Sequence, residues 1–339
     1  MTHSSHALSC LYAYLPLGTA VTYGGINIAG FEFGCDGEGN CDPSAATPPG
    51  QTGIDQMTHF VSKGLNAFRL PVSWQYLVTD LGNTINASRI ATYDKLVQGC
   101  VDAGAKMCIV DLHNYARWDG KIIGQSAPSG PTDDQFADLW SQIAKKYKAQ
   151  SKVAFGTMNE PHNLSMETWV TTVQAAVTAI RNAGATDNII LLPGTNHQAA
   201  GGFAENSGGL AAVKNVDGSK TNLVFDVHQY LDSDSTGTHA GCVTNATKGS
   251  FAPLATWARD QNRQVFLSET GGGPQDSTCI SYLKQTLSYL NDNSDVYLGW
   301  TTWAAGSFKT SYVLSETPSG DTDVPLVKQV IIPALSDLP

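Results

Sequence analysis

From residue 21 onward, short apolar segments alternate with amphipathic segments, and no linker interrupts the alternation. The apolar segments have the length and side chains of buried strands, whereas segments such as 89–103 place apolar residues near helical spacing. The expected strands are 21–29, 67–72, 106–112, 153–158, 188–192, 222–227, 264–270 and 296–300, and the expected helices include 54–63, 89–103, 133–147, 166–183, 252–261 and 280–290. Eight strands separated by helices favour one closed (β/α)8 barrel, the TIM barrel.

We therefore expect a single catalytic α/β domain over residues 21–339, a length within the usual range of this barrel. A doubly wound open sheet is the alternative, weakened because no Gly-x-Gly-x-x-Gly follows the first strand. Residues 1–20 lack a basic head followed by a long apolar core. We interpret them as a leader or an expression remnant and exclude them from the fold.

The net charge of −10 argues against a nucleic-acid partner, because phosphate binding needs a basic surface. No run of about 18 apolar residues occurs, so no membrane span is expected. We expect a monomer.

The segment 153–162 ends a strand abruptly in polar residues. Pro161 forbids further ladder hydrogen bonds, so Glu160 is placed at the C-terminal edge of the strand. Parallel α/β architectures carry catalytic groups at this edge. A structural turn, in which Asn159 and Glu160 bond the local backbone, explains the segment equally well on its own.

A second strand, 264–270, delivers Glu269 to the same end of the sheet and runs straight into three glycines. Hydrolysis of a glycosidic bond needs two carboxyl groups, one to protonate the leaving oxygen and one to attack or stabilise the anomeric centre. The pair Glu160 and Glu269 therefore favours a glycosidase over a structural turn.

Other strands end in polar or aromatic side chains that would converge on the same cleft. A single histidine at a strand end is more often structural, but six strands ending this way point to a site. The residues are Arg69, Asp111, His113, Asn114, Asn159, His228, Tyr230 and Trp303.

These strand ends resemble those of glycoside hydrolase family 5, above all its secreted fungal endoglucanases, also called cellulases. The resemblance runs from about residue 24 to the last strand and rests on the motifs Phe68-Arg69-Leu70-Pro71, Asp111-Leu112-His113-Asn114-Tyr115, Asn159-Glu160-Pro161, Asp226-Val227-His228-Gln229-Tyr230 and Glu269-Thr270-Gly271, with Trp303. It implies a barrel and a retaining hydrolase of internal β-1,4-glucosidic bonds in cellulose or cello-oligosaccharides. Glu160 corresponds to the acid/base and Glu269 to the nucleophile, and neither a metal nor an organic cofactor is implied. The family's remaining active-site positions match Arg69, His113, Asn159, His228, Tyr230 and Trp303.

Each role has a physical requirement. Glu269 must be ionised to attack, so Arg69 and Tyr230 are expected beside it. Glu160 must hold a proton, so we expect its pKa to be raised by partial burial and by the second carboxylate. Asn159 is suited to bond a sugar 2-hydroxyl, and retention predicts carboxyl groups roughly 5–5.5 Å apart.

Substrate preference rests on aromatic residues. Trp74, Tyr115, Trp118 and Trp303 would line an open cleft for a flat β-1,4-glucan, although Trp74 could equally pack against a helix. A family-5 hydrolase of mannan, xyloglucan or mixed-linkage glucan, and a non-catalytic carbohydrate-binding barrel, are the alternatives. His197 stands where the fungal enzymes commonly carry an aromatic residue, which would alter one sugar subsite.

The chain has seven cysteines, and proximity along the chain favours the disulfides Cys35–Cys41, Cys100–Cys108 and Cys242–Cys279, with Cys10 left over. Six cysteines allow 15 connectivities, so other pairings stay open. Three disulfides would fit a secreted protein, and Cys-x-x-Cys metal motifs are absent from the sequence. The family's late disulfide has no cysteine partner after Cys279. Sequons at Asn86, Asn163 and Asn245 agree with secretion.

Overall fold

The computed structural model describes residues 20–336, so the expectations for residues 1–19 and for Cys10 lie outside it. Eight parallel strands close into a barrel in the order β1-β10-β9-β8-β7-β6-β3-β2. They are β1 Tyr23–Ala29, β2 Ala67–Val72, β3 Met107–Leu112, β6 Val153–Gly156, β7 Ile190–Pro193, β8 Leu223–His228, β9 Val265–Glu269 and β10 Tyr297–Gly306. The predicted β/α barrel is confirmed, and a closed ring excludes the open sheet.

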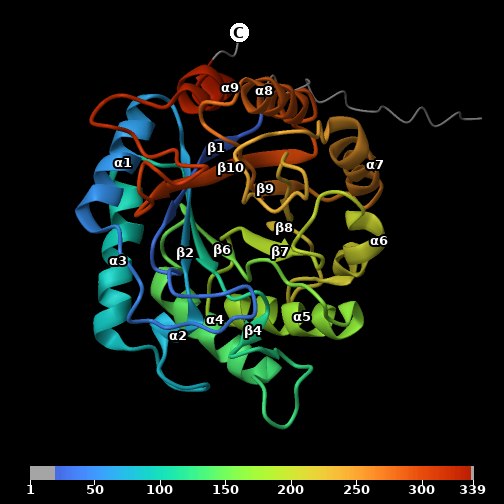
Figure 1. The fold of residues 1–339 in the computed structure, drawn as a ribbon. Coiled ribbons are helices and arrows are strands. Elements are labelled where there is room, and N and C mark those ends of the chain that lie inside the picture. Colours follow the sequence, from blue (N-terminus) through green and yellow to red (C-terminus); the bar gives the residue numbers. More distant parts are fainter. Residues whose placement is uncertain (1–19, 337–339) are drawn as a thin grey trace, which may run out of the picture.

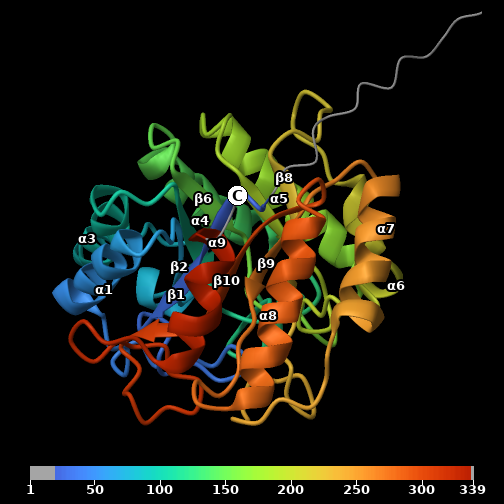
Figure 2. The ribbon, with the colours of Figure 1, turned by 90° about the horizontal axis from the view of Figure 1, so that it is seen from above.

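Helices surround the strands on all sides (Figure 1). They are α1 Gly50–Ser62, α3 Ala87–Asp102, α4 Asp133–Tyr147, α5 Met166–Asn182, α6 Phe203–Ser207, α7 Ala252–Asp260, α8 Ser277–Asp292 and α9 Pro333–Ser336. In Figure 2, α7 and α8 run alongside each other, and α8 contacts β10 while α9 contacts β1. Between residues 20 and 336, no helix is long and apolar enough to cross a membrane.

Side chains inside the barrel change from apolar to polar along each strand. Alternate strand residues share one face. On β8, Val224 belongs to a small interior cluster, and Asp226 and His228 follow it on the same face toward the strand's C-terminal end. On β2, Ala67 in that cluster is followed by Arg69. Inside the barrel, the apolar cluster therefore comes first along these strands, and the charged groups follow toward their C-terminal ends.

A register shift between β8 and β9 helps to aim the site residues. Val227 pairs with Leu267 but His228 pairs with Glu269, so Ser268 is the extra residue. A bulge of this kind redirects side chains. It accounts for two consecutive β9 residues, Ser268 and Glu269, both reaching polar partners inside the barrel.

Several elements differ from the sequence prediction. β10 continues from the expected end at residue 300 to residue 306, because Ile28 and Ala29 of β1 pair with Ala305 and Gly306. The short helix α2 (Trp74–Leu77) and the hairpin β4 (Arg117–Trp118) and β5 (Lys121–Ile122) were not predicted. These pieces lie in loops beyond the strand ends, where turn chemistry rather than hydrophobic periodicity determines the structure.

The disulfides of the structure are the pairs that proximity favoured. Cys35–Cys41 closes a short loop after β1, and Cys100–Cys108 links α3 to β3. Cys242–Cys279 ties the long loop after β8 to the first turn of α8. Two of the three bridges thus hold loops that follow strand ends.

Candidate active site

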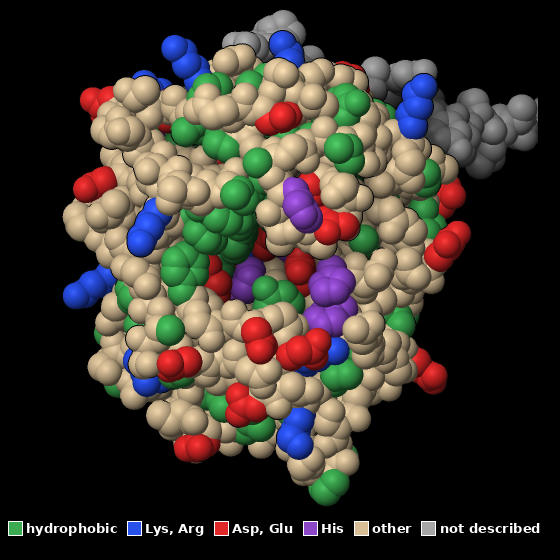
Figure 3. Space-filling view, viewed as in Figure 1, with side chains coloured by type: hydrophobic (Ala, Val, Ile, Leu, Met, Phe, Trp, Pro, Cys, Tyr) green, Lys and Arg blue, Asp and Glu red, His purple; other side chains and the backbone are tan. Residues whose placement is uncertain are grey.

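A hollow opens at the centre of the face seen in Figure 3, with histidine and acidic side chains on its floor and hydrophobic side chains along one wall. A cavity of about 410 Å³ is part of it, lined by Tyr115, Glu160, His197 and His228 together with residues 234–236 and their neighbours. The expected site residues from different strand ends are therefore brought together.

Glu269 lies at the end of β9 and is held at both carboxylate oxygens. Oε1 accepts a short hydrogen bond from Nη1 of Arg69, and Oε2 accepts one of 2.8 Å from Oη of Tyr230. The glutamate is 4% exposed. Both contacts match the expectation that a cation and a hydroxyl donor would stabilise its negative charge.

Arg69 is a fully buried guanidinium at the centre of the site. Its Nη2 contacts Asp111 (2.9 Å) and donates to Oδ1 of Asn159 (2.7 Å), and its Nη1 donates to Oδ1 of Asn27 (3.0 Å). Burial acts to lower the pKa of Arg69, but the charges of Asp111, Glu269 and Asp226 outweigh burial and raise it. Arg69 is thus a permanent cation that fixes Glu269 and Asn159 relative to each other.

Glu160 has a left-handed backbone, with φ of 43°, directly after the end of β6. Its backbone N–H donates to Oε1 of Gln198 (2.6 Å). Its carboxylate faces two histidines: Oε1 is 2.8 Å from Nδ1 of His228, and Oε2 is 3.4 Å from Nδ1 of His197. A non-glycine residue in this conformation is strained, and such strain persists only where the surroundings enforce it.

The expectation of a raised pKa for Glu160 is wrong for this state. Burial works to raise the pKa, but hydrogen bonds from His197 and His228, together with their charges, outweigh it and lower the pKa below its ordinary value. Burial acts to lower the pKa of His228, but the charge of Glu269 and the hydrogen bond to Glu160 outweigh burial and raise this pKa. The proton of the pair therefore rests on the imidazole side, next to Glu160.

The two glutamates lie close together across His228. One carboxylate oxygen of Glu160, one of Glu269 and a ring nitrogen of His228 all lie within 4.8 Å of one another. Nδ1 of His228 is also 3.6 Å from Oε2 of Glu269, and Nε2 is 2.9 Å from Oγ of Ser268. The arrangement offers an anchored carboxylate and a second carboxylate with an adjacent proton source.

Trp303 and His113 form the aromatic part of the site. Their rings stack with centroids 5.5 Å apart and an interplanar angle of 20°. Nδ1 of His113 is 3.0 Å from Asp111, and Nε1 of Trp303 donates to Oη of Tyr312 (3.2 Å). Both rings are held in place by polar partners.

The model of the cellulase family, glycosyl hydrolase family 5, matches residues 27–306. The chain belongs to this family. The match spans the barrel from β1 to the end of β10, which includes every strand end described above.

Two similar proteins are fungal endoglucanases. Endoglucanase EG-II of Hypocrea jecorina is 54% identical, with 92% of this chain and 78% of the relative covered. The manganese dependent endoglucanase Eg5A of Phanerodontia chrysosporium is 43% identical, with 94% and 82% covered.

Solved family-5 structures share the fold closely. Cel5A (EG2) of Hypocrea jecorina has a TM-score of 0.89 at 54% identity, covering 92% of this chain and 98% of its own. XacCel5A, solved in complex with cellopentaose, has a TM-score of 0.81 at 31% identity, covering 91% and 99%.

Two predicted substrate contacts of this family-5 chain are corrected. Trp74 is 1% exposed and packs against Trp118 and against Phe136 of α4, so it cannot stack on a sugar. Asn114 is fully buried, where its amide accepts from the backbone of Trp74 (2.6 Å) and donates to Gln75 (2.6 Å). Both residues make packing or hydrogen-bond contacts inside the protein. Trp118 is half-buried, with one edge against Trp74.

Sequence reasoning missed three residues that touch the site. The side-chain amide of Asn27 donates to the carbonyls of Ser268 and Thr302, and its oxygen accepts a hydrogen bond from Arg69. A polar residue inside an otherwise apolar strand could have identified Asn27 from the sequence. Gln198 and Ser268 bond Glu160 and His228. For these two, no local pattern distinguishes them from ordinary loop and strand residues.

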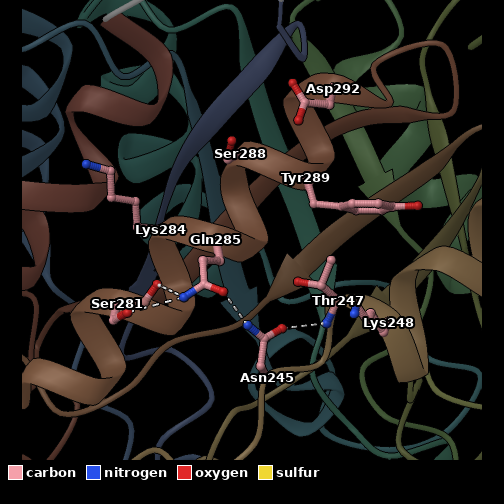
Figure 4. A pocket seen from close by; sticks show the side chains of 9 residues that line it. All are labelled: Asn245, Thr247, Lys248, Ser281, Lys284, Gln285, Ser288, Tyr289 and Asp292. Atoms are coloured by element: carbon pink, nitrogen blue, oxygen red, sulfur yellow. Dashed lines mark hydrogen bonds between the residues drawn. The ribbon is translucent and has the colours of Figure 1, made fainter.

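A larger cavity of about 770 Å³ lies apart from the strand ends, between α8 and the segment 245–248 (Figure 4). Its lining is polar: Nδ2 of Asn245 donates to Oε1 of Gln285 (2.7 Å), and the ring of Tyr289 extends beside Thr247 and Lys248. Asn245 and Thr247 belong to one of the three sequons. The cavity contains neither paired carboxylates nor a strand end, and we assign it no catalytic role.

Proposed function

We propose that this chain is a retaining endo-β-1,4-glucanase that uses Glu160 as acid/base and Glu269 as nucleophile. The observation that carries the proposal is the separation of the two carboxylates, with oxygens within 4.8 Å of each other. Retaining glycosidases hold their carboxyl groups about 5–5.5 Å apart, whereas inverting ones leave about 6.5–9.5 Å for a water molecule. The endoglucanase names of the fungal relatives supply the substrate class.

In the first step, a carboxylate oxygen of Glu269 attacks the anomeric carbon while Glu160 transfers a proton to the glycosidic oxygen. The bond from the anomeric carbon to that oxygen breaks, the shortened chain leaves as an alcohol, and a glycosyl ester forms on Glu269. Arg69 and Tyr230 stabilise Glu269 as a carboxylate before attack. The proton for Glu160 comes from the pair that it forms with His228.

In the second step, Glu160 is a carboxylate and takes a proton from water as the water oxygen attacks the anomeric carbon. The ester bond to Glu269 breaks, and the product keeps the β configuration after two inversions. The low pKa of Glu160 in the free site suits this half of the cycle. The same residue must carry a proton in the first half, and His228 lies at hydrogen-bond distance to share one.

Side chains around the carboxylates would hold the sugar. Arg69 binds the amide oxygen of Asn159, which leaves the amide nitrogen to donate to a sugar 2-hydroxyl. Trp303, stacked on His113, offers an apolar face to a pyranose ring. A relative solved with cellopentaose supports an oligosaccharide of β-1,4-linked glucose as the ligand.

A different β-glycan is the second candidate. His197 lies in the cleft beside Glu160, half exposed, where it would meet the substrate. An imidazole offers hydrogen bonds and less stacking area than a larger ring, which favours a more branched or substituted glycan such as xyloglucan. A non-catalytic binding barrel is disfavoured, because it would not need the Glu160 and Glu269 pair.

Secretion is part of the proposal. Three disulfides tie loops of this barrel, and such bonds persist in oxidising environments. The three sequons and the fungal endoglucanase relatives support the same location.

The name of one relative raises the question of manganese. Between residues 20 and 336, one group that could hold a cation is Glu160, His228 and Glu269. Arg69 already balances Glu269 there, and His228 binds Glu160, so a cation would have to displace both contacts. The double displacement requires no metal at these carboxylates.

The test combines activity with the stereochemistry of rescue. Viscosity loss of carboxymethylcellulose should fall by about 10²–10⁴-fold in Glu160→Ala and at least as much in Glu269→Ala, because general acid catalysis and the nucleophile are lost. Azide should rescue Glu160→Ala to a β-glycosyl azide and Glu269→Ala to an α-glycosyl azide on an activated aryl glycoside. The exposed Glu205→Gln is the control and should keep full activity.

Two outcomes would change the proposal. Activity on mannan or xyloglucan without activity on carboxymethylcellulose would keep the mechanism and replace the substrate. Unchanged activity in both alanine variants would refute the site assignment.

A further inference from the structure

The loop after β8 gathers oxygen and nitrogen atoms around one imidazole. Nδ1 of His239 lies 3.3 Å from Oδ2 of Asp232, 3.4 Å from Oδ1 of Asp234 and 3.2 Å from Oγ1 of Thr238. A ring nitrogen carries at most one hydrogen, so Nδ1 cannot make a full hydrogen bond to both carboxylates, whereas the Thr238 hydroxyl can itself donate to a ring nitrogen. Both carboxylate distances also exceed the about 2.7–2.9 Å of a charge-assisted N–H···O bond. Two carboxylates therefore converge on one ring nitrogen that can donate at most one hydrogen.

The charge of the cluster is not balanced. Asp232 is 3% exposed, and its Oδ1 has no hydrogen-bond partner among the described residues. Its Oδ2 points into the cluster and accepts from the backbone N–H groups of Thr238 and His239. Over residues 20–336, the ion pairs of Asp232 and Asp234 are with His239 alone, which is neutral unless protonated. A buried carboxylate in this setting is costly unless it is paired with a cation or coordinates a metal.

We propose that Asp232, Asp234 and His239 form a binding site for a divalent cation, with Mn²⁺ as the preferred ion. Metal–ligand bonds of about 2.0–2.2 Å place neighbouring ligand atoms about 3.0–3.5 Å apart, which includes the 3.3 and 3.4 Å observed here. Carboxylate oxygens suit Mg²⁺, Ca²⁺ and Mn²⁺, whereas imidazole suits transition metals, so the mixed set favours Mn²⁺.

Calcium fits the loop less well. The spacing Asp232-x-Asp234-x-Thr236-Gly237 matches the first half of a calcium loop with its glycine at the sixth position. The twelfth position, which supplies a bidentate glutamate in such loops, is Val243 here. The carboxylates available are therefore too few for the six to eight oxygen ligands that Ca²⁺ prefers.

The site lies on the rim of the catalytic cleft. Asp234 and its neighbours Ser235 and Thr236 line the same cavity as Glu160 and His228. The loop also packs on Tyr230, since a Cβ added to Gly237 would lie 2.5 Å from the Tyr230 ring. A bound cation would fix this loop over the hydroxyl donor of Glu269. That effect on catalysis rests on the proposed function, whereas binding itself does not.

The experiment measures binding without substrate. The full chain is stripped with EDTA, dialysed at pH 7 and titrated with MnCl₂ by calorimetry, with the melting temperature followed in parallel. One Mn²⁺ per chain should bind and raise the melting temperature, and Asp234→Asn and His239→Gln should each weaken binding at least tenfold. Asp217→Asn is the matched control, because the side chains of Asp217 and Asp234 each accept from the backbone N–H two positions on, but Asp217 forms no ion pair with a histidine of residues 20–336. It should bind Mn²⁺ as the unchanged chain does.

Three outcomes would overturn the proposal: no saturable Mn²⁺ binding, binding that survives both Asp234→Asn and His239→Gln, or binding of Ca²⁺ in place of Mn²⁺. Binding that is lost in Glu160→Gln but kept in Asp234→Asn would place the ion at the catalytic carboxylates and equally refute the site. Because no step uses cellulose, failure of the proposed function would leave these results standing.

Discussion

His197 lines the cleft beside the carboxylate of Glu160. Its ring stacks on His162 with centroids 4.2 Å apart and an interplanar angle of 11°, and its Nδ1 is 3.4 Å from Glu160. Asn196, His197 and Gln198 all have positive φ, and Gln198 bonds the backbone of Glu160. Three left-handed residues in a row are costly, so this turn is held by the contacts that it makes with Glu160.

The predicted consequence concerns the pH profile. His197 contributes to lowering the pKa of Glu160, so His197→Phe, which keeps the stacking on His162 but removes the hydrogen bond and charge, should raise that pKa. A general acid with a higher pKa keeps its proton to higher pH. The alkaline limb of kcat/KM against pH should therefore move upward, measured on a chromogenic cello-oligosaccharide. An unmoved limb in His197→Phe would show that His228 alone sets the ionisation of Glu160.

At the scale of elements, α2 follows the end of β2 and packs against β4 and α4. Trp74 begins α2, and Ser73 caps the helix by accepting from the backbone N–H of Tyr76. The Trp74 indole fills the space between Trp118 and Phe136 of α4. An aromatic residue after a strand end thus joins the barrel to an outer helix.

Truncation of this indole should reduce stability and leave substrate binding nearly unchanged. Trp74→Ala removes a fully buried aromatic ring, which costs about 3–5 kcal/mol in cores. Denaturant unfolding should show this loss, while KM on soluble cello-oligosaccharides stays within about twofold. The half-buried Trp118→Ala is the comparison and should cost less stability. A large rise in KM with unchanged stability for Trp74→Ala would restore Trp74 as a sugar contact.

The same elements show what the sequence could and could not predict. Hydrophobic runs and the polar residues after them predicted the eight strands and brought Arg69, His228 and Glu269 to one cleft, because strand direction and period are local properties. Burial of Trp74 depends on Phe136, which lies 62 residues later in the chain, and no local pattern encodes it. The predicted direction of the Glu160 pKa shift failed for the same reason, since His197 comes from the loop after β7 and His228 from the end of β8.

At the scale of the whole molecule, three buried carboxyl groups link stability to pH. Burial raises the pKa of Glu32 to about 7, of Asp226 to about 6 and of Glu316 to about 8. Each group is protonated in the folded barrel at a pH where the unfolded chain has already released the proton. The unfolded state therefore binds fewer protons, so the free energy of unfolding falls as pH rises from about 4 to about 8.

Glu316 isolates this effect in one side chain. It is fully buried, its Oε2 accepts from Oγ1 of Thr302 (2.6 Å), and no ion pair with it occurs in residues 20–336. The pKa of Glu316 is about 8 in the folded chain, against an ordinary 4.5. Between these two pH values, burial of this carboxyl group therefore lowers the free energy of unfolding by about 1.4 kcal/mol for each pH unit. Glu316→Gln, which cannot ionise, should be more stable than the unchanged chain at pH 8 by a few kcal/mol and similar to it at pH 4.5. Unfolding in guanidinium at both pH values measures this, with the exposed Glu205→Gln as control; an equal gain at both pH values would mean that packing, not ionisation, is responsible.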